Sequence, residues 1–284
     1  MSKNYSCSSN LFASHDLETL LKHVSAIGCN YVDLWFSPPF CKHVDPFNDN
    51  PVELKKIVNS YNLDISALTI YFTTHEEKMK SLEFAAEIEI PYIVMEPSPL
   101  DNFYEKMSNI DVKGRTLGEP GIDFDGFVEL LNNYVKRGEE LGVKIALEVP
   151  HVYTLTETIE EVEAVLKEIS SDYLLLTMAP PHILARGGKI EDAINLLGEK
   201  TAIYYLWDVK EGYKYPDDDR AFGTGKQQIP GHGMLNLESI IDQLKSKGFT
   251  GFWDVKCHGT EGWTDAEQIS SLVKEGMKHI FPKL

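Results

Sequence analysis

Basic residues are scarce in this sequence of 284 residues: 27 lysines and arginines stand against 44 aspartates and glutamates, a formal net charge of −17. A protein that follows a phosphate backbone needs a basic face, so this balance argues against nucleic-acid binding and against docking on anionic lipid. No apolar run approaches the roughly 20 residues that a membrane-spanning helix requires. The opening MSKNYSCSSNLF has no apolar core, which argues against a secretory signal peptide.

Cysteine is also rare. The four cysteines, Cys7, Cys29, Cys41 and Cys257, are scattered without a CxxC spacing. This pattern argues against a disulfide framework and against a thiolate zinc site, and it favours a reducing, cytoplasmic setting. A linker rich in proline, glycine or serine is missing as well, so we expect residues 1–284 to form one domain.

The sequence does contain a regular alternation of short β-branched or aromatic runs with amphipathic helical patterns. Helical patterns separate eight strand-like runs, at residues 5–12, 31–36, 65–72, 92–96, 143–149, 173–178, 202–208 and 251–258. Strand and helix in alternation imply parallel pairing through right-handed crossovers. Eight such units in a chain of this length predict a single (β/α)₈ TIM barrel of the α/β class. A doubly wound open sheet is the second choice, but the first strand is not followed by a glycine-rich turn.

The barrel prediction places the chemistry where strands end and the following loops begin. Two of these loops are long, at about 97–122 and 209–235, and we expect them over the C-terminal face. Glu148 ends the fifth strand, and His151 follows it. Glu96 ends the fourth strand. After the sixth strand, the prolines of Ala-Pro-Pro fix the backbone that presents His182.

The last two strands add charged and aromatic candidates. Trp207 and Asp208 end the seventh strand, where an aromatic face can stack on a sugar ring. In the eighth strand, alternation places Asp254, Lys256 and His258 on one face, and we expect that face to point into the barrel. Glu148, His182 and Lys256 are therefore the predicted catalytic residues. The predicted substrate-binding residues are Asp208, His258, His151, Trp207 and Glu96.

Several segments resemble the xylose-isomerase-like TIM-barrel superfamily, in particular its sugar phosphate isomerase/epimerase branch. They include GCNYVDLWF, KRGEELGVKIALEVPH, PPHILARGG, the LWD of the seventh strand and, most specifically, PGHGMLNLESIIDQLKSKGFTGFWDVK. The resemblance covers nearly the whole chain. It implies a barrel that binds a small sugar or polyol and moves a proton next to a carbonyl. Dimers and tetramers are common in the family, so the resemblance leaves open whether this chain forms a homo-oligomer.

The resemblance also implies one divalent metal at the barrel mouth, held by a Glu, an Asp, a His and a second Glu. Glu148 matches the first Glu, and His182 matches the His of the family's D-x-x-H pattern. Ala179, Tyr205 and Lys256 stand where the other three ligands are expected. A slip of two residues would place Asp254 in the last position.

Two interpretations of the metal site follow. In one, Lys256 sits about where the metal would and pairs with Glu148. It then polarises a carbonyl, acts as an acid or base, or forms an imine. In the other, Glu148, His182, Asp208 and His258 form a mixed nitrogen and oxygen site for zinc or manganese. The sequence therefore leaves open whether the protein binds a divalent metal as a cofactor.

The function predicted is that of a sugar isomerase or epimerase. One alternative is a lyase or dehydratase on the same substrate class, and another is a non-catalytic sugar-binding relative that has lost its metal site. DNA phosphodiester hydrolysis, known in the superfamily, conflicts with the net charge of −17. Lys226 in FGTGKQQ is a weak signal for a phosphate group, which leaves open whether the substrate is phosphorylated.

Overall fold

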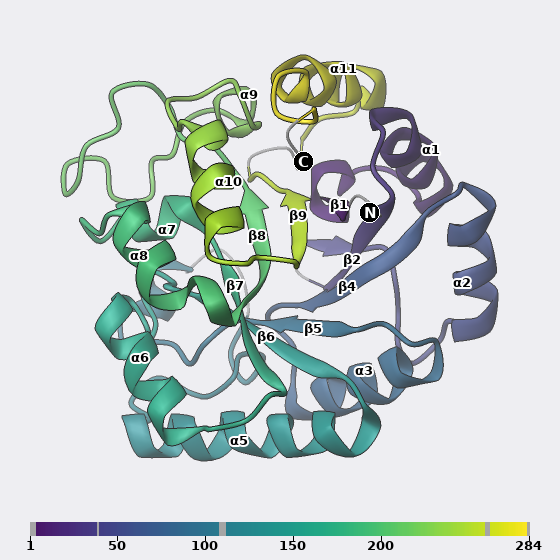
Figure 1. Ribbon diagram of the computed structural model, residues 1–284. Coiled ribbons are helices and arrows are strands. Elements are labelled where there is room, and N and C mark those ends of the chain that lie inside the picture. Colours follow the sequence, from purple (N-terminus) through teal and green to yellow (C-terminus); the bar gives the residue numbers. More distant parts are fainter. Residues whose placement is uncertain (1–3, 39, 108–111, 259–261, 283–284) are drawn as a thin grey trace.

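Eight parallel strands close into a barrel in the computed structural model, which describes residues 4–38, 40–107, 112–258 and 262–282. Each strand pairs with two neighbours, and the ring closes because β1 pairs with both β2 and β9 (Figure 1). The strands are β1 (Tyr5–Ser8), β2 (Tyr31–Ser37), β4 (Asp64–Ile70), β5 (Tyr92–Met95), β6 (Lys144–Val149), β7 (Leu174–Met178), β8 (Thr201–Leu206) and β9 (Phe252–Val255). The predicted (β/α)₈ barrel is confirmed.

Amphipathic helices form the outer ring of the barrel (Figure 1). They are α1 (Leu17–Ile27), α2 (Pro51–Ser60), α3 (His75–Glu87), α5 (Phe124–Leu141), α6 (Ile159–Glu168), α8 (Ile190–Leu197), α10 (Leu237–Ser246) and α11 (Ala266–Met277). Local sequence sets several of their ends: Thr74 and Thr158 form capping boxes at the starts of α3 and α6. Gly142 ends α5 in the left-handed region, where a side chain would be strained. Within the described residues, no helix is both long and apolar enough to span a bilayer.

The structure differs from the predicted elements mainly near the barrel mouth. The first predicted strand ends at Ser8 and continues as the 3₁₀ helix η1 (Ser9–Phe12). The two prolines before His182 open the short helix α7 (Pro180–Leu184), since the first turn of a helix does not need their missing N–H groups. Further short elements are β3 (Cys41–Lys42), which pairs antiparallel with β2, α4 (Phe103–Lys106), η2 (Gly198–Lys200) and α9 (Gly225–Gln228).

Aromatic contacts across the barrel show which face of β9 points inward. The Phe252 ring lies 4.8 Å from Tyr31 and 6.0 Å from Tyr92, centroid to centroid, although β9 pairs with neither β2 nor β5. These three rings close the floor of the barrel at the N-terminal ends of the strands. Side chains alternate along a strand, so Asp254 and Lys256 point inward above Phe252, as the sequence predicts.

Candidate active site

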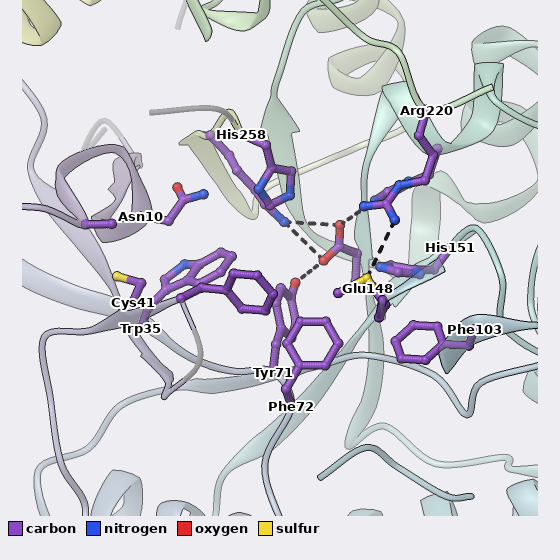
Figure 2. A pocket seen from close by; sticks show the side chains of 15 residues that line it. Asn10, Trp35, Cys41, Tyr71, Phe72, Phe103, Glu148, His151, Arg220 and His258 are labelled. Atoms are coloured by element: carbon purple, nitrogen blue, oxygen red, sulfur yellow. Dashed lines mark hydrogen bonds and ion pairs between the residues drawn. The ribbon is translucent and has the colours of Figure 1, made fainter. Parts of the chain in front are cut away.

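A cavity of about 200 Å³ opens at the carboxyl ends of the strands (Figure 2). This volume lies below the range typical of drug-sized ligands and suits a small metabolite. Glu148 and Lys256 reach it from β6 and from the residue after β9, and His182 reaches it from α7. Aromatic rings form the opposite wall, as expected of a site that accepts the C–H face of a sugar. These rings are Trp35, Phe40, Tyr71, Phe72 and Phe103.

An ion pair between Glu148 and Lys256 forms the base of the cavity. Lys256 Nζ lies 3.2 Å from Glu148 Oε1 and 3.1 Å from Oε2, and both side chains are 1% exposed. The Tyr71 hydroxyl donates a short hydrogen bond to Glu148 Oε2. Burial alone would raise the pKa of Glu148, but the Lys256 ammonium and the His182 hydrogen bond hold it well below its usual 4.5. Glu148 is therefore a carboxylate at neutral pH.

Aromatic rings surround the Lys256 ammonium. Its Nζ lies 4.0 Å from the centroid of the Tyr205 ring and between 5.1 and 5.3 Å from the rings of Tyr71, Trp35 and Trp207. Such faces attract a cation, and the attraction grows when water is excluded. Burial lowers the pKa of Lys256 from its usual value, and Glu148 opposes this shift. The aromatic rings and the Glu148 carboxylate together stabilise the ammonium of Lys256, which is almost fully buried.

Three histidines lie around this pair, and the protein environment keeps them neutral. His182 Nε2 lies 3.5 Å from Glu148 Oε1, and the ring of His151 lies 4.4 Å from that of His182. His258 packs edge-on against Trp207 at 4.7 Å. Burial is the largest cause that lowers the pKa of each imidazole, to about 3 for His151 and well below 6.5 for His258. At neutral pH the histidines add hydrogen-bonding groups to the cavity and no charge.

Three predicted substrate-binding residues lie outside the cavity lining. Asp208 is fully buried, and its two oxygens accept backbone N–H groups from residues 209, 231, 233 and 235 at 2.9–3.1 Å. It therefore organises the loop after β8. Glu96 accepts the Phe72 N–H and faces Lys78. Trp207 lies behind the lining, where its indole N–H donates to Gln228 Oε1.

Sequence reasoning missed Tyr71 and Arg220 as residues of the site. Tyr71 is next to the last residue of the predicted strand 65–72 and directly follows β4, so its position carried a signal. A tyrosine in a β-branched run is, however, more often a core residue. Arg220 lies in the long loop after β8 and reaches the same cavity. Only its place in a loop predicted to cover the C-terminal face pointed toward the site.

The carboxylate and imidazole groups do not fit a resident divalent cation. Glu148, His151 and His182 each offer a ligand atom, and these atoms lie within 4.8 Å of one another. Both oxygens of Glu148 are already held by the Lys256 ammonium, so a dication bound there would sit beside a buried positive charge. Asp208 is committed to backbone groups, and Asp254 is buried outside the lining. The four-ligand set of Glu148, His182, Asp208 and His258 is not assembled.

Comparison with known proteins adds independent findings. A family model described as "Xylose isomerase-like TIM barrel" matches residues 21–281. An inosose isomerase of Halalkalibacterium halodurans is 24% identical over 238 residues, which cover 82% of this chain and 76% of that protein.

Two solved structures share the fold. One, described as the IOLI protein with a binding zinc atom, superposes with a TM-score of 0.74 at 18% identity, covering 99% of this chain and 98% of the other. The other is a probable 3-DHS dehydratase, AsbF, from Bacillus anthracis, with a TM-score of 0.71 at 14% identity and 99% of both chains covered.

Proposed function

The chain belongs to the xylose isomerase-like TIM barrel family, and from this premise we propose that it is an isomerase or epimerase that moves a proton next to the carbonyl of a small carbohydrate or polyol. The observation that carries the proposal is the ion pair of Glu148 and Lys256 at the base of a small cavity with aromatic walls. The isomerase activity of the curated relative supports the same reaction class.

Glu148 is the proposed base. Its carboxylate is ionised, but a carboxylate paired with an ammonium has little affinity for a proton. A substrate carbonyl oxygen bound at Lys256 changes this balance. As the C–H bond breaks, negative charge develops on that oxygen and draws the ammonium toward it. The proton affinity of Glu148 then rises at the moment when it receives the proton.

Tyr71 and His182 position the base for this transfer. Tyr71 donates to Glu148 Oε2, and burial together with the charge of Glu148 raises its pKa well above 10, so it keeps its proton. His182 contacts the other oxygen, with its Nε2 at 3.5 Å from Glu148 Oε1. With both oxygens oriented, Glu148 can return the proton to the neighbouring carbon, as an isomerase requires. An epimerase needs in addition a second acid that protonates the opposite face of the same carbon.

A dehydratase is the second candidate. It requires the same base and a leaving hydroxyl on the next carbon, and one structure with the same fold is described as a probable dehydratase. The presence of a base at Glu148 favours both reactions equally, and the fate of the substrate hydroxyl separates them.

Proton exchange in D₂O tests the proposal. We expect the protein, incubated with inosose and with a panel of ketoses and aldoses, to exchange the hydrogen next to the carbonyl for deuterium, detected by NMR. Interconversion of isomers supports an isomerase, and loss of water with a new ultraviolet absorbance supports a dehydratase. Binding in a thermal-shift assay without exchange or turnover would instead support a non-catalytic sugar-binding protein.

Two further expectations accompany the proposal. We propose that the loops at 97–122 and 209–235 cover the C-terminal face, because Phe103 and Met107 of the first and Arg220 of the second line the cavity. Residues 108–111 of the first loop lie outside the described residues. We also propose that the protein acts in the cytoplasm, since all four cysteines are free thiols.

A further inference from the structure

Resting on the proposed function, we propose that the substrate carries one negatively charged oxyanion group, a carboxylate or a phosphate monoester, and that Arg220 binds it at the mouth of the cavity. Glu148 and Lys256 would then act on the carbonyl at the base of the same cavity. This assigns a specificity residue and a substrate charge to the site.

The charge balance of the cavity is the first support. Its lining contains two cations, Lys256 and Arg220, and one acid, Glu148. Burial lowers the pKa of each of the three lining histidines, which favours their neutral forms. The described lining is therefore positive by one charge in a chain whose formal net charge is −17. A carboxylate, with one negative charge, neutralises this excess, and a phosphate monoester, with about 1.5 to 2 negative charges at pH 7, more than neutralises it. A neutral sugar leaves the excess uncompensated.

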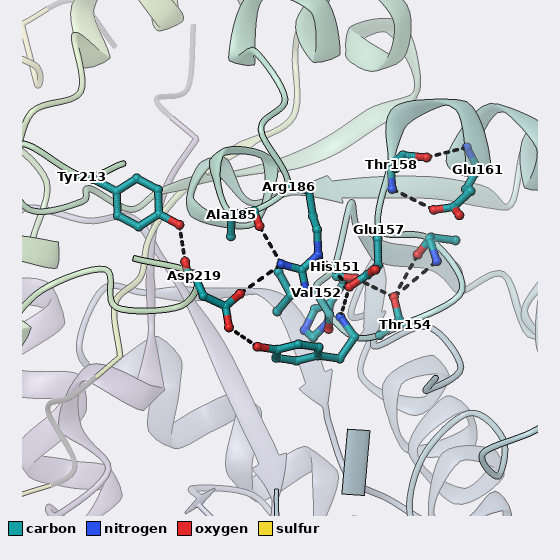
Figure 3. Close-up of polar contacts among 12 residues, drawn as sticks. His151, Val152, Thr154, Glu157, Thr158, Glu161, Ala185, Arg186, Tyr213 and Asp219 are labelled. Atoms are coloured by element: carbon teal, nitrogen blue, oxygen red, sulfur yellow. Dashed lines mark hydrogen bonds and ion pairs between the residues drawn. The ribbon is translucent and has the colours of Figure 1, made fainter. Parts of the chain in front are cut away.

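The neighbours of Arg220 are the second support, because the nearby acids are already engaged. Asp218 pairs with Lys210 at 2.5 Å, and Asp219 pairs with Arg186 at 3.1 Å. Asp219 also accepts the Tyr153 hydroxyl (Figure 3). Across the part of the chain that the structure describes, no carboxylate forms an ion pair with Arg220. Its guanidinium is always charged and offers N–H groups in a planar fork that matches a carboxylate or phosphate.

The local structure also anchors the backbone that carries Arg220. Tyr213 donates its hydroxyl to the backbone oxygen of Asp219, and Arg186 joins the Asp219 carboxylate to Glu157, so the residue before Arg220 is held on several sides (Figure 3). Arg220 then points into the cavity toward Glu148 and His151 (Figure 2). Its Nη1 lies 3.9 Å from Met107 Sδ, and its guanidinium carbon lies 5.8 Å from the centroid of the Tyr153 ring. These contacts orient the guanidinium without neutralising it.

The test compares ligands that share a skeleton and differ in charge. D-glucose, D-glucuronate and D-glucose 6-phosphate form one set, and acetate and inorganic phosphate serve as bare anions. Dissociation constants are measured by calorimetry and by thermal shift for the wild type, Arg220→Gln, Arg220→Lys and a control, Arg137→Gln. Arg137 lies on α5 and pairs with Glu83 and Glu140.

We expect the wild type to bind at least one anionic probe more tightly than its neutral counterpart. Arg220→Gln should raise the dissociation constant of that probe by about tenfold or more, which corresponds to about 1.4 kcal/mol. The affinity for neutral probes should not change. Arg220→Lys should restore part of the affinity, because it keeps the charge and loses the fork. Arg137→Gln should behave as the wild type. Preference for glucuronate or for glucose 6-phosphate identifies the oxyanion.

Three results would overturn the inference: neutral probes that bind as tightly as charged ones, an anion preference that survives Arg220→Gln, or the absence of any Arg220-dependent effect of every anion, acetate and phosphate included. Turnover of a neutral sugar without charge preference would remove this inference and leave the proposed isomerase intact. Arg220-dependent anion binding without proton exchange on any carbonyl substrate would support this inference and contradict the proposed isomerase.

Discussion

Two lysine–glutamate pairs are buried among the described residues, and they differ in what surrounds them. Lys256 and Glu148 are 3.1 Å apart at the base of the cavity. Lys78 and Glu96 are 3.9 Å apart between α3 and the end of β5, outside the cavity lining. Lys78 also donates to the backbone oxygen and hydroxyl of Thr73. Lys256 has aromatic faces in place of such acceptors.

The two pairs differ in the partners available to each buried charge. A buried charge is stable only when the chain supplies partners for it, and backbone oxygens are such partners for Lys78. Lys256 forms its ion pair with Glu148 and faces a cavity that a ligand can enter. We therefore propose that the same two residue types have a structural role at one place and a chemical role at the other.

Replacing the two glutamates tests this comparison most strongly. Glu148→Gln should lower kcat by about 10²- to 10⁴-fold, because general-base catalysis contributes that much. The matched variant Glu96→Gln should keep kcat near the wild-type value and should affect stability instead. Steady-state kinetics and thermal unfolding of both variants provide the measurement. Equal losses of kcat in the two variants would contradict the distinction.

Replacing the two lysines should separate activity from stability. Lys256→Met should lower kcat by about 10²- to 10³-fold, the usual loss when a group that stabilises a developing oxyanion is removed. Lys78→Met should lower the free energy of unfolding by about 3–5 kcal/mol, because it leaves Glu96 buried without its cation. Urea denaturation measures the second effect. Adding Glu96→Gln to Lys78→Met should recover part of this stability, and failure to do so would argue against the pair.

The two glutamates should also give opposite pH dependences of stability. Burial raises the pKa of Glu96 to about 7, against an ordinary 4.5. The folded state then binds more protons than the unfolded state between these values, so stability falls as pH rises from 4.5 to 7, by at most about 1.4 kcal/mol per pH unit. The pKa of Glu148 is lowered, so its contribution is present above 4.5 and is lost as pH falls through its folded value.

Denaturation series from pH 4 to 8 check these signs. Glu96→Gln should flatten the slope between pH 4.5 and 7, and Glu148→Gln should change the slope only on the acid side of 4.5. A stability difference between Glu96→Gln and the wild type that does not vary with pH would show that Glu96 does not titrate in this range.

Removal of metal should have the smallest effect. Because Lys256 holds both oxygens of Glu148, we expect EDTA to leave activity unchanged, and metal analysis of untagged protein to find less than one equivalent of zinc or manganese. A complete loss of activity that metal restores would contradict this expectation. It would place a cation on Glu148, His151 and His182, the group whose ligand atoms converge.

Local patterns were sufficient to predict the barrel and the central residues of the site. Helix caps, glycine stops and β-branched runs depend on neighbours in the sequence, and they located all eight barrel strands. Residues at strand ends must meet at one rim of a barrel, which brought Glu148, His182, Lys256, His151 and His258 into one cavity. Their catalytic and binding roles stay predictions.

Other features depended on contacts between distant segments. Asp208 has the position of a site residue in the sequence, yet the loop after β8 folds back and uses both its oxygens. Tyr71 touches Glu148 across 77 residues of chain, and Arg220 reaches the cavity from within a long loop. Loop paths and contacts across the barrel are set by packing between distant segments, so the hydrophobic periodicity of the sequence does not predict them.

The sequence by itself determined an α/β barrel with an acid, an amine and several imidazoles at its mouth, because these follow from period, strand parity and chain order. Only the tertiary structure decided between the two interpretations by pairing Lys256 with Glu148, and only it showed that aromatic rings surround the amine. Only it showed, too, that the acids near Arg220 are paired with other cations among the described residues. The reason is physical: charge, burial and solvation belong to the folded surroundings of a group, and those surroundings come from segments that are far apart in the chain.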